Sequence, residues 1–501
     1  MSTAPRPGAE STVTVPDLLS APHLVDVTQP GMAGLAQWLA KQGADVTGSV
    51  APTDERHPHQ TVERLTAAGV RVRLGFQPEH VGEDRTAVVW SGLVIGPHSE
   101  LDRAQELRLP VLARAHALSA VCAQSGIEAV AVGGSHSTAT AAAVLAAALD
   151  DGLTGWILNA PARGQAVGHG APARLVVDLC PDTATHEAAP PDAWKHRPAT
   201  RYLGARPKPA VALITATSAN APHYVDNIEG LDAAEHLARS ATMVVLPTWD
   251  NGIKILRERL GNRPGPRVVT VGLGETDEIR ILVPRWMGEA YHLTLQYRGE
   301  RHAFVLPIAG RHHALAACAA IATALVLGED AGEIAERLGA FLGVERSLTV
   351  LGTHSRITVV ESRARHPREI SEDVAAARWL TEGSVTAVLE PDGFARASAH
   401  ADELGTALGG ADTAVLLPVS TPLTIVDADD PLDDIAAAAR KALGSDHVHR
   451  VRSGPCEPGI EQLIASVSEP GDLVLVIGTS AAAHLGPRLL AHLASLVPQP
   501  R

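Results

Sequence analysis

The chain has 501 residues, of which 45% are hydrophobic and 20% are charged, so it is long enough for about two to four domains. The net charge of −14 and the aromatic content of 3% argue against nucleic acid as the main partner, because phosphate and base recognition require basic and aromatic side chains. The 4 cysteines have no CxxC spacing, which disfavours zinc binding and a disulfide framework.

The N-terminal region opens with a Pro/Ser/Thr/Gly-rich stretch, residues 1–20, which predicts a disordered tail. From residue 23 the segments HLVDVT, QPG and MAGLAQWLAKQG predict a strand, a turn and a helix, and ADVTGSV predicts a second strand. The alternation continues to about residue 122. We therefore predict a Rossmann-like domain over residues 21–124.

A second α/β segment begins with a strand at 127–133, followed by a loop and a helix at 138–150. Further strands are predicted for RLVVDL, AVALITA, TMVVLP and RVVTVG, and residues 292–308 alternate around Gly299 as a hairpin does. A long helix follows in GRHHALAACAAIATALVLG. These patterns predict a central domain over residues 125–348.

The last segment shows RITVVES, VTAVLEP, TAVLLPV and LVLVIG as strands with helices between them, which predicts a second Rossmann-like domain over 349–501. The fold class is thus α/β, with three consecutive α/β domains. No signal peptide is apparent, and the apolar stretches around 139–149 and 314–327 are too short to span a bilayer. We expect a cytoplasmic protein without a membrane partner.

The segment AVAVGGSHSTATAAAVL, residues 129–145, has the layout of a phosphate-binding loop. Such a loop needs glycines, a helix N-terminus, a lysine for the terminal phosphates and a hydroxyl for magnesium. The segment 123–170 contains no lysine, so a strand-to-helix turn without a ligand remains an alternative. The candidate cofactor-binding residues of this degenerate loop are Gly133, Gly134, Ser135, His136, Ser137, Thr138 and Thr140.

Several motifs together resemble the Mur ligase family, in particular its branch that joins L-alanine to UDP-N-acetylmuramate. The segment GGSHSTAT resembles GTHGKTTT, GRHHALAACAAIATAL resembles GxHNxxNAxAAIAxA, and GVERSLTVLG resembles GVKRRFExLG. VVESRARHPREI resembles VIDDYAHHPTEI, and PGMAGLAQWLAKQGADVTGS resembles the family's opening segment. Their order is kept over about 470 residues. The resemblance implies three domains, ATP and magnesium, and a reaction in which a phosphorylated carboxylate is attacked by an amine.

The resemblance breaks at the residues that would carry this chemistry. The loop lysine falls on Thr138, the magnesium-binding glutamate on Ser218 and the adenine-contacting asparagine on His313. Thr140 and Ser218 are therefore the family's magnesium positions, and serine lacks the anionic oxygen that the ion prefers. We predict from this joint loss that the protein uses no cofactor and binds no metal, although the family would use ATP and magnesium.

Other candidate site residues are weighed against simpler roles. His136, His223 and Asp178 are catalytic candidates, although the residue pattern favours a histidine satisfied within a turn at His136. The remaining candidates are nucleotide-cleft residues (His312, His313, Arg346 and His366) and substrate-binding residues (Gly31, Ser91 and Arg114). The two adjacent histidines could instead cap a helix, and Arg346 could form an inter-domain salt bridge.

Three functions follow from these observations. The leading prediction is a non-catalytic Mur ligase homologue that binds a protein partner, such as a genuine ligase or biosynthetic enzyme, or a small anionic metabolite. The first alternative is a repurposed enzyme with ATP-independent or altered acyl chemistry. The second alternative is an active amide-bond-forming ligase of peptidoglycan precursor synthesis.

Overall fold

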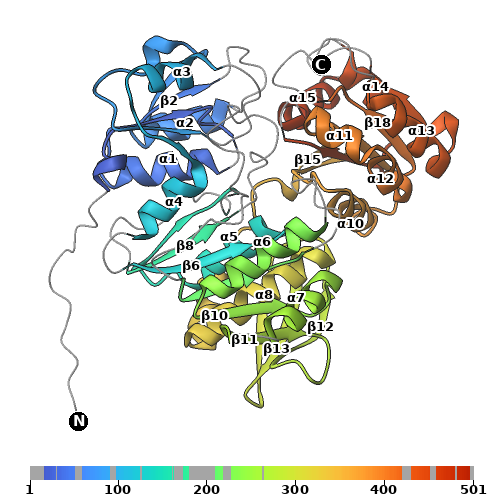
Figure 1. Cartoon of the computed structure of the whole chain (residues 1–501). Coiled ribbons are helices and arrows are strands. Elements are labelled where there is room, and N and C mark those ends of the chain that lie inside the picture. The colour runs from blue at the N-terminus through green and yellow to red at the C-terminus, as the bar shows by residue number, and fades with distance from the viewer. Residues whose placement is uncertain are drawn as a thin grey trace.

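The computed structural model describes residues 16–496 except 30, 51–58, 91–97, 124–126, 161, 163–172, 180–208, 218–226, 262–263, 420–429, 452–458 and 480–481. Its strands form three separate sheets that follow one another along the chain, each flanked by helices (Figure 1). The predicted class, three consecutive α/β domains, is confirmed. The exact domain limits stay predictions. None of the described helices combines the length and the apolar character needed to cross a membrane.

The first sheet is parallel throughout, with the strand order β3-β2-β1-β4-β5. The strands are β1 (Pro22–Val25), β2 (Thr47–Val50), β3 (Arg71–Leu74), β4 (Ala87–Trp90) and β5 (Val111–Ala113). The helices are α1 (Met32–Lys41), α2 (His59–Ala67), α3 (Ser99–Glu106) and α4 (Arg114–Ala123). The end of the predicted tail is folded, because Asp17–Leu19 form a 3-10 helix and Leu19 is fully buried in this core.

The second sheet has nine strands in the order β14-β13-β12-β11-β10-β9-β6-β8-β7. They are β6 (Glu128–Gly133), β7 (Thr154–Ile157), β8 (Arg174–Asp178), β9 (Val211–Ile214), β10 (Met243–Pro247), β11 (Arg267–Gly272), β12 (Ile279–Trp286), β13 (Tyr291–Tyr297) and β14 (Glu300–Leu306). The predicted hairpin is confirmed, since β13 and β14 pair antiparallel around Gly299. The sequence patterns missed β7 and β12.

The helices of the central domain are α5 (Thr138–Ala148), α6 (Asn227–Ser240), α7 (Asn251–Gly261), α8 (Arg311–Leu327) and α9 (Ala331–Leu338). Helices α5 and α8 are alanine-rich and almost entirely buried in one core with the sheet. Alanine side chains let the two helices approach closely while they still remove apolar surface from water. This packing fixes the N-termini of both helices relative to the sheet.

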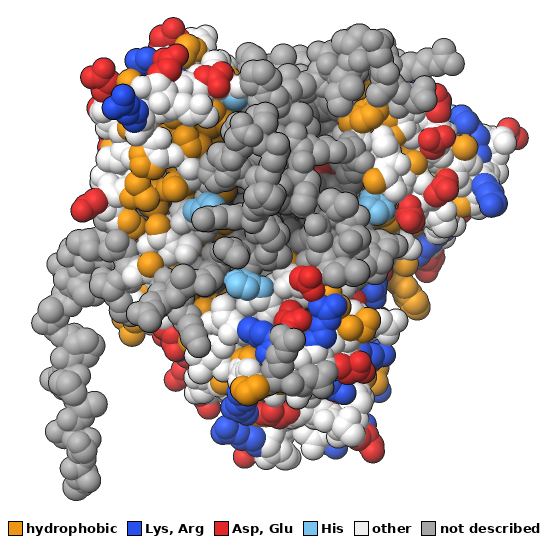
Figure 2. Space-filling view, viewed as in Figure 1, with side chains coloured by type: hydrophobic (Ala, Val, Ile, Leu, Met, Phe, Trp, Pro, Cys, Tyr) orange, Lys and Arg blue, Asp and Glu red, His pale blue; other side chains and the backbone are white. Residues whose placement is uncertain are grey.

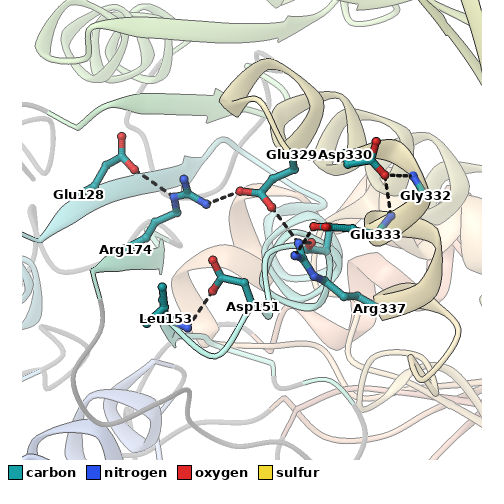
Figure 3. Close-up of polar contacts among 10 residues, drawn as sticks. Glu128, Asp151, Leu153, Arg174, Glu329, Asp330, Gly332, Glu333 and Arg337 are labelled. Carbon is teal, nitrogen blue, oxygen red and sulfur yellow. Dashed lines mark hydrogen bonds and ion pairs between the residues drawn. The ribbon is translucent and has the colours of Figure 1, made fainter. Parts of the chain in front are cut away.

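A network of ion pairs braces this domain at the amino ends of β6 and β8 (Figure 3). Arg174 lies between Glu128, at 3.0 Å, and Glu329, at 2.9 Å, and Arg337 of α9 contacts Glu329 at 2.8 Å. Asp330 caps α9 through the N–H groups of Gly332 and Glu333. The amino ends of the strands are therefore held by structural contacts, and the candidate site lies at their carboxyl ends.

The third sheet has the order β15-β16-β20-β17-β18-β19, in which only β15 runs antiparallel to its neighbour. Its strands are β15 (Ser347–His354), β16 (Ile357–Ser362), β17 (Val385–Leu389), β18 (Thr413–Leu416), β19 (Val448–Arg450) and β20 (Leu473–Ile477). Its helices are α10 (Pro367–Ala377), α11 (Phe394–Ala399), α12 (Ala401–Ala407), α13 (Leu432–Leu443), α14 (Ile460–Ser466) and α15 (Ala482–Ser495).

The space-filling view shows acidic and basic side chains interspersed over the described part of one face of the molecule (Figure 2).

Candidate functional site

The glycine-rich loop forms a tight turn between β6 and α5. Gly134 has φ +144°, and a Cβ atom there would lie 2.9 Å from the backbone nitrogen of Ala216, which is closer than side chains tolerate. Ser135 donates its N–H to the carbonyl of Ala216, and the Thr215 hydroxyl donates to the carbonyl of His136 at 2.6 Å. The loop is thus pinned to the end of β9, and only glycine fits at position 134.

The loop binds an anionic group of the third domain. The N–H of Ser137, at the start of α5, donates to Oε1 of Glu369 at 2.9 Å. Burial opposes ionisation of Glu369, but nearby His136 and the Ser137 N–H more than offset it, so the pKa of this carboxyl lies below its usual range. A helix N-terminus favours negative charge. The start of α5 therefore holds a carboxylate oxygen of the third domain at its free N–H group.

Two histidines from different domains face each other beside this contact. The ring of His136 stacks on the ring of His366, with centroids 5.6 Å apart, and its Nδ1 lies 3.0 Å from the hydroxyl of Ser135. His366 caps α10 by accepting the N–H of Arg368. Burial lowers the pKa of His136 to about 4, so the ring is neutral near pH 7.

The pKa of His136 predicts acid sensitivity. Below pH 6.5 the unfolded chain binds a proton at this ring that the folded chain does not bind until about pH 4, so the free energy of unfolding falls as the pH falls. We expect this ring to cost up to about 2 kcal/mol of stability between pH 7.5 and pH 5. Urea unfolding of the wild type and of His136→Asn at both pH values measures the effect. An equal loss in the two proteins would contradict the assignment.

A second cluster lies where α8 of the central domain meets α10. His312 and His313 are tilted against each other, with ring centroids 3.9 Å apart, and both Nε2 atoms face Oδ1 of Asp373. Nδ1 of His313 lies 2.9 Å from the hydroxyl of Thr140. Burial opposes ionisation of Asp373, but its contacts with the two rings hold its pKa well below the usual range. The candidates Thr140, His312 and His313 are therefore brought together.

The substrate-binding candidates gather between the first two domains. Gly31 has φ +78° and lies against the guanidinium of Arg114, which contacts Oδ1 of Asn159 at 3.2 Å and the carbonyl of Asp178 at 3.5 Å. The carboxylate of Asp178 is fully buried and accepts the N–H of Asn159 at 3.3 Å. Asp178 therefore holds the site together. Ser91, Ser218 and His223 lie outside the described residues.

Arg346 does not reach the loop. Its guanidinium instead contacts Glu361 at 3.3 Å and the carbonyl of Gly478, so it joins the end of the predicted central domain to the third sheet. Four charged residues that do reach the site were not predicted: Asp250, Arg368, Glu369 and Asp373. Arg368 could have been noticed, because it stands where the related motif HPTEI has threonine. Glu369 could have been noticed as well, because it keeps the glutamate of that motif, whereas Asp250 and Asp373 carry no local signal.

The fold and the loop define a class of three-domain α/β proteins in which a glycine-rich loop of the central domain meets the third domain. The Mur ligase family model, described as its catalytic domain, matches residues 23–125. UDP-N-acetylmuramate–L-alanine ligases of Streptomyces griseus and Streptomyces coelicolor are each 30% identical to this chain, over 96% of it and 99% of each relative. The chain belongs to the Mur ligase family.

Solved structures agree with this fold. A UDP-N-acetylmuramate–alanine ligase of Thermotoga maritima has a TM-score of 0.73 at 19% identity, covering 95% of this chain and 99% of that one. A murein peptide ligase of Psychrobacter arcticus has a TM-score of 0.72 at 17% identity, with the same coverage. At these identities the likeness concerns the fold.

The comparisons correct two predictions. Relatives that match nearly the whole chain bear the names of ligases, which contradicts the prediction of a non-catalytic homologue. The predicted lack of a cofactor is wrong for the same reason, because ligases of this type use ATP and magnesium. Both predictions rested on the loss of the loop lysine, the magnesium-binding glutamate and the adenine-contacting asparagine at Thr138, Ser218 and His313.

Proposed function

We propose that this protein is an ATP-dependent ligase that forms an amide bond between UDP-N-acetylmuramate and the amine of an amino acid. In the proposed reaction the carboxylate takes the terminal phosphoryl group of ATP, and ADP leaves. The amine then attacks the acyl carbon, loses a proton and displaces phosphate. The observation that carries the proposal is the Ser137 N–H donated to a carboxylate, in a chain aligned over nearly its full length with such ligases.

The residues of the loop fit a nucleotide phosphate. Gly134 lies so close to the backbone of Ala216 that no side chain fits, and the N-terminus of α5 already accepts an anion at Ser137. Bound ATP would replace the Glu369 carboxylate at this N–H group. The stacked, neutral rings of His136 and His366 close the loop on the side of the third domain.

Magnesium fits by the chemistry of the available oxygen atoms. The hydroxyl of Thr140 lies in the first turn of α5, and Asp178 ends β8, which pairs with β6 beside the loop. Hydroxyl and carboxylate oxygens are the ligands that magnesium prefers. When bound with the nucleotide, magnesium supplies positive charge to the phosphate oxygens.

Arg368 supplies the positive charge that Thr138 lacks. It precedes Glu369, the residue bonded to the loop, and its charge contributes to the low pKa of His136. Its contact with Asp250 is long, at 3.5 Å, its contact with Glu372, at 3.2 Å, is a surface pair along the same helix, and its side chain is 43% exposed. The guanidinium can therefore turn toward a phosphate on the loop. Arginine suits this role because its donors match phosphate oxygens in pairs.

The proposal is tested by phosphate release from ATP in the presence of magnesium, UDP-N-acetylmuramate and each amino acid in turn. We expect release that requires all components and a product whose mass equals the sum of the two substrates minus water. UDP-N-acetylglucosamine, which has no carboxylate, is the control substrate. The proposal fails if folded protein gives no release with any amino acid while a Streptomyces relative turns over in the same assay.

A further inference from the structure

Three buried atoms from two domains converge: Nε2 of His312 and Nε2 of His313 both face Oδ1 of Asp373 as ion pairs, and none of the three makes a hydrogen bond of regular geometry with a described residue. The exposed fractions of these side chains are only 7%, 12% and 2%. Buried polar atoms normally make well-aligned hydrogen bonds, and here two rings share one carboxylate oxygen at ion-pair distance instead. We propose that His312, His313 and Asp373 bind a divalent transition metal ion of the zinc class.

The distances between these atoms suit such an ion. Oδ1 of Asp373 lies 3.0 Å from Nε2 of His312 and 3.6 Å from Nε2 of His313, and all three atoms lie within 4.8 Å of one another. Ligands at about 2.0–2.1 Å from a tetrahedral zinc ion are separated by roughly 3.4 Å. The two shorter separations fall on either side of that value, so small side-chain movements complete the site.

The remaining polar atoms of the three side chains, Nδ1 of each histidine and Oδ2 of Asp373, already contact neighbouring polar groups. Nδ1 of His312 faces Glu372 at 3.5 Å, and Nδ1 of His313 lies 2.9 Å from the Thr140 hydroxyl. If Nδ1–H donates in both rings, each Nε2 keeps its lone pair for the metal. The other oxygen of Asp373 accepts the hydroxyl of Ser362. This is the arrangement in which outer hydrogen bonds orient the ligands of a metal.

The ligand set separates this site from the magnesium that accompanies ATP. Two imidazole nitrogens and one carboxylate suit zinc, cobalt or nickel, whereas magnesium prefers oxygen atoms alone. Three protein ligands leave a fourth position for water. The histidines begin α8 and the aspartate belongs to α10, so the ion would clip the central domain to the third domain. Through Thr140 it also contacts the glycine-rich loop.

The test uses the full-length protein, stripped of metal by a chelator and titrated with Zn²⁺ or Co²⁺ alone. We expect about one equivalent of Zn²⁺ to remain bound after desalting, measured by elemental analysis, and Co²⁺ to give visible absorption typical of nitrogen and oxygen ligands. His313→Gln and Asp373→Asn are expected to weaken Zn²⁺ binding by at least about 100-fold. Excess Mg²⁺ should not displace the ion.

The matched control is His80→Gln, because His80 also lies against a buried carboxylate, Glu100, at 2.9 Å but in the first domain. This variant should bind Zn²⁺ as the wild type does. Failure of the wild type to retain metal, or unchanged binding in folded His313→Gln and Asp373→Asn, would show that the cluster is an ion pair only. These measurements need no substrate, so they stand or fall independently of the ligase activity.

Discussion

Replacing Arg368 with glutamine is expected to lower kcat for ATP-dependent ligation by about 100- to 1000-fold, the loss typical when one charge-stabilising donor is removed. The reason is that no lysine occupies the loop, and in the proposed site Arg368 takes its place as a positive charge close enough to lower the pKa of His136. The KM for the amino acid should change little, because that substrate carries no phosphate. Steady-state phosphate release at saturating substrates measures the effect.

Arg378→Gln is the matched control, because Arg378 ends the same helix and pairs with Asp412 at 2.6 Å on the surface. Its activity should stay within about twofold of the wild type, since surface ion pairs contribute little. In the double variant Thr138→Lys/Arg368→Gln, the restored loop lysine should recover part of the lost activity. Full activity in Arg368→Gln would show that the positive charge comes from another residue.

Replacing Gly134 with alanine is expected to destabilise the central domain by about 3 kcal/mol and to abolish phosphate release. The added Cβ atom would meet the Thr215 hydroxyl and the Ala216 backbone nitrogen, and φ of +144° is unfavourable for any L side chain. The loop must move away from β9, which carries its N–H groups out of place. Thermal unfolding and the release assay measure the two effects.

Gly152→Ala separates strain from steric conflict. Gly152 has φ +79°, but nothing lies within 4 Å of the Cβ atom that alanine would add. This control should lose only about 1 kcal/mol and keep its activity. Equal losses in the two variants would mean that backbone strain alone explains the effect at position 134.

The architecture could be predicted from the sequence because strands and helices give hydrophobic patterns over short segments of the chain. Buried parallel strands are continuous apolar runs, as in β6 and β9, and the alternation around Gly299 marks a hairpin. Helix α8 was evident from its long alanine-rich pattern. β7 was missed because its four residues, TGWI, begin with threonine and glycine and so give no continuous apolar run. The prediction of disorder was wrong at the end of the tail for a different reason, because Leu19 is buried in a core that later segments of the chain form.

The candidate site was only partly readable. The loop Gly133–Ser137 was found from its glycines, but its neighbours Asp250, Arg368 and Glu369 lie more than 110 residues away along the chain. A motif comparison concerns one position at a time, so it showed only that Thr138 stands where the family has lysine. It could not show that Arg368, from another domain, lies close enough to affect the charge of His136.

The amino-acid sequence by itself determined the three α/β domains and the glycine-rich turn, because each depends on contacts between near neighbours in the chain. It also indicated the Mur ligase family, because that family's motifs occur in order along the chain. Only the tertiary structure decided which charges meet at that turn and that His312, His313 and Asp373 share one buried point. Electrostatic and ligand geometry depend on distances in space, and these are set when α10 of the third domain docks against α5 and α8 of the second.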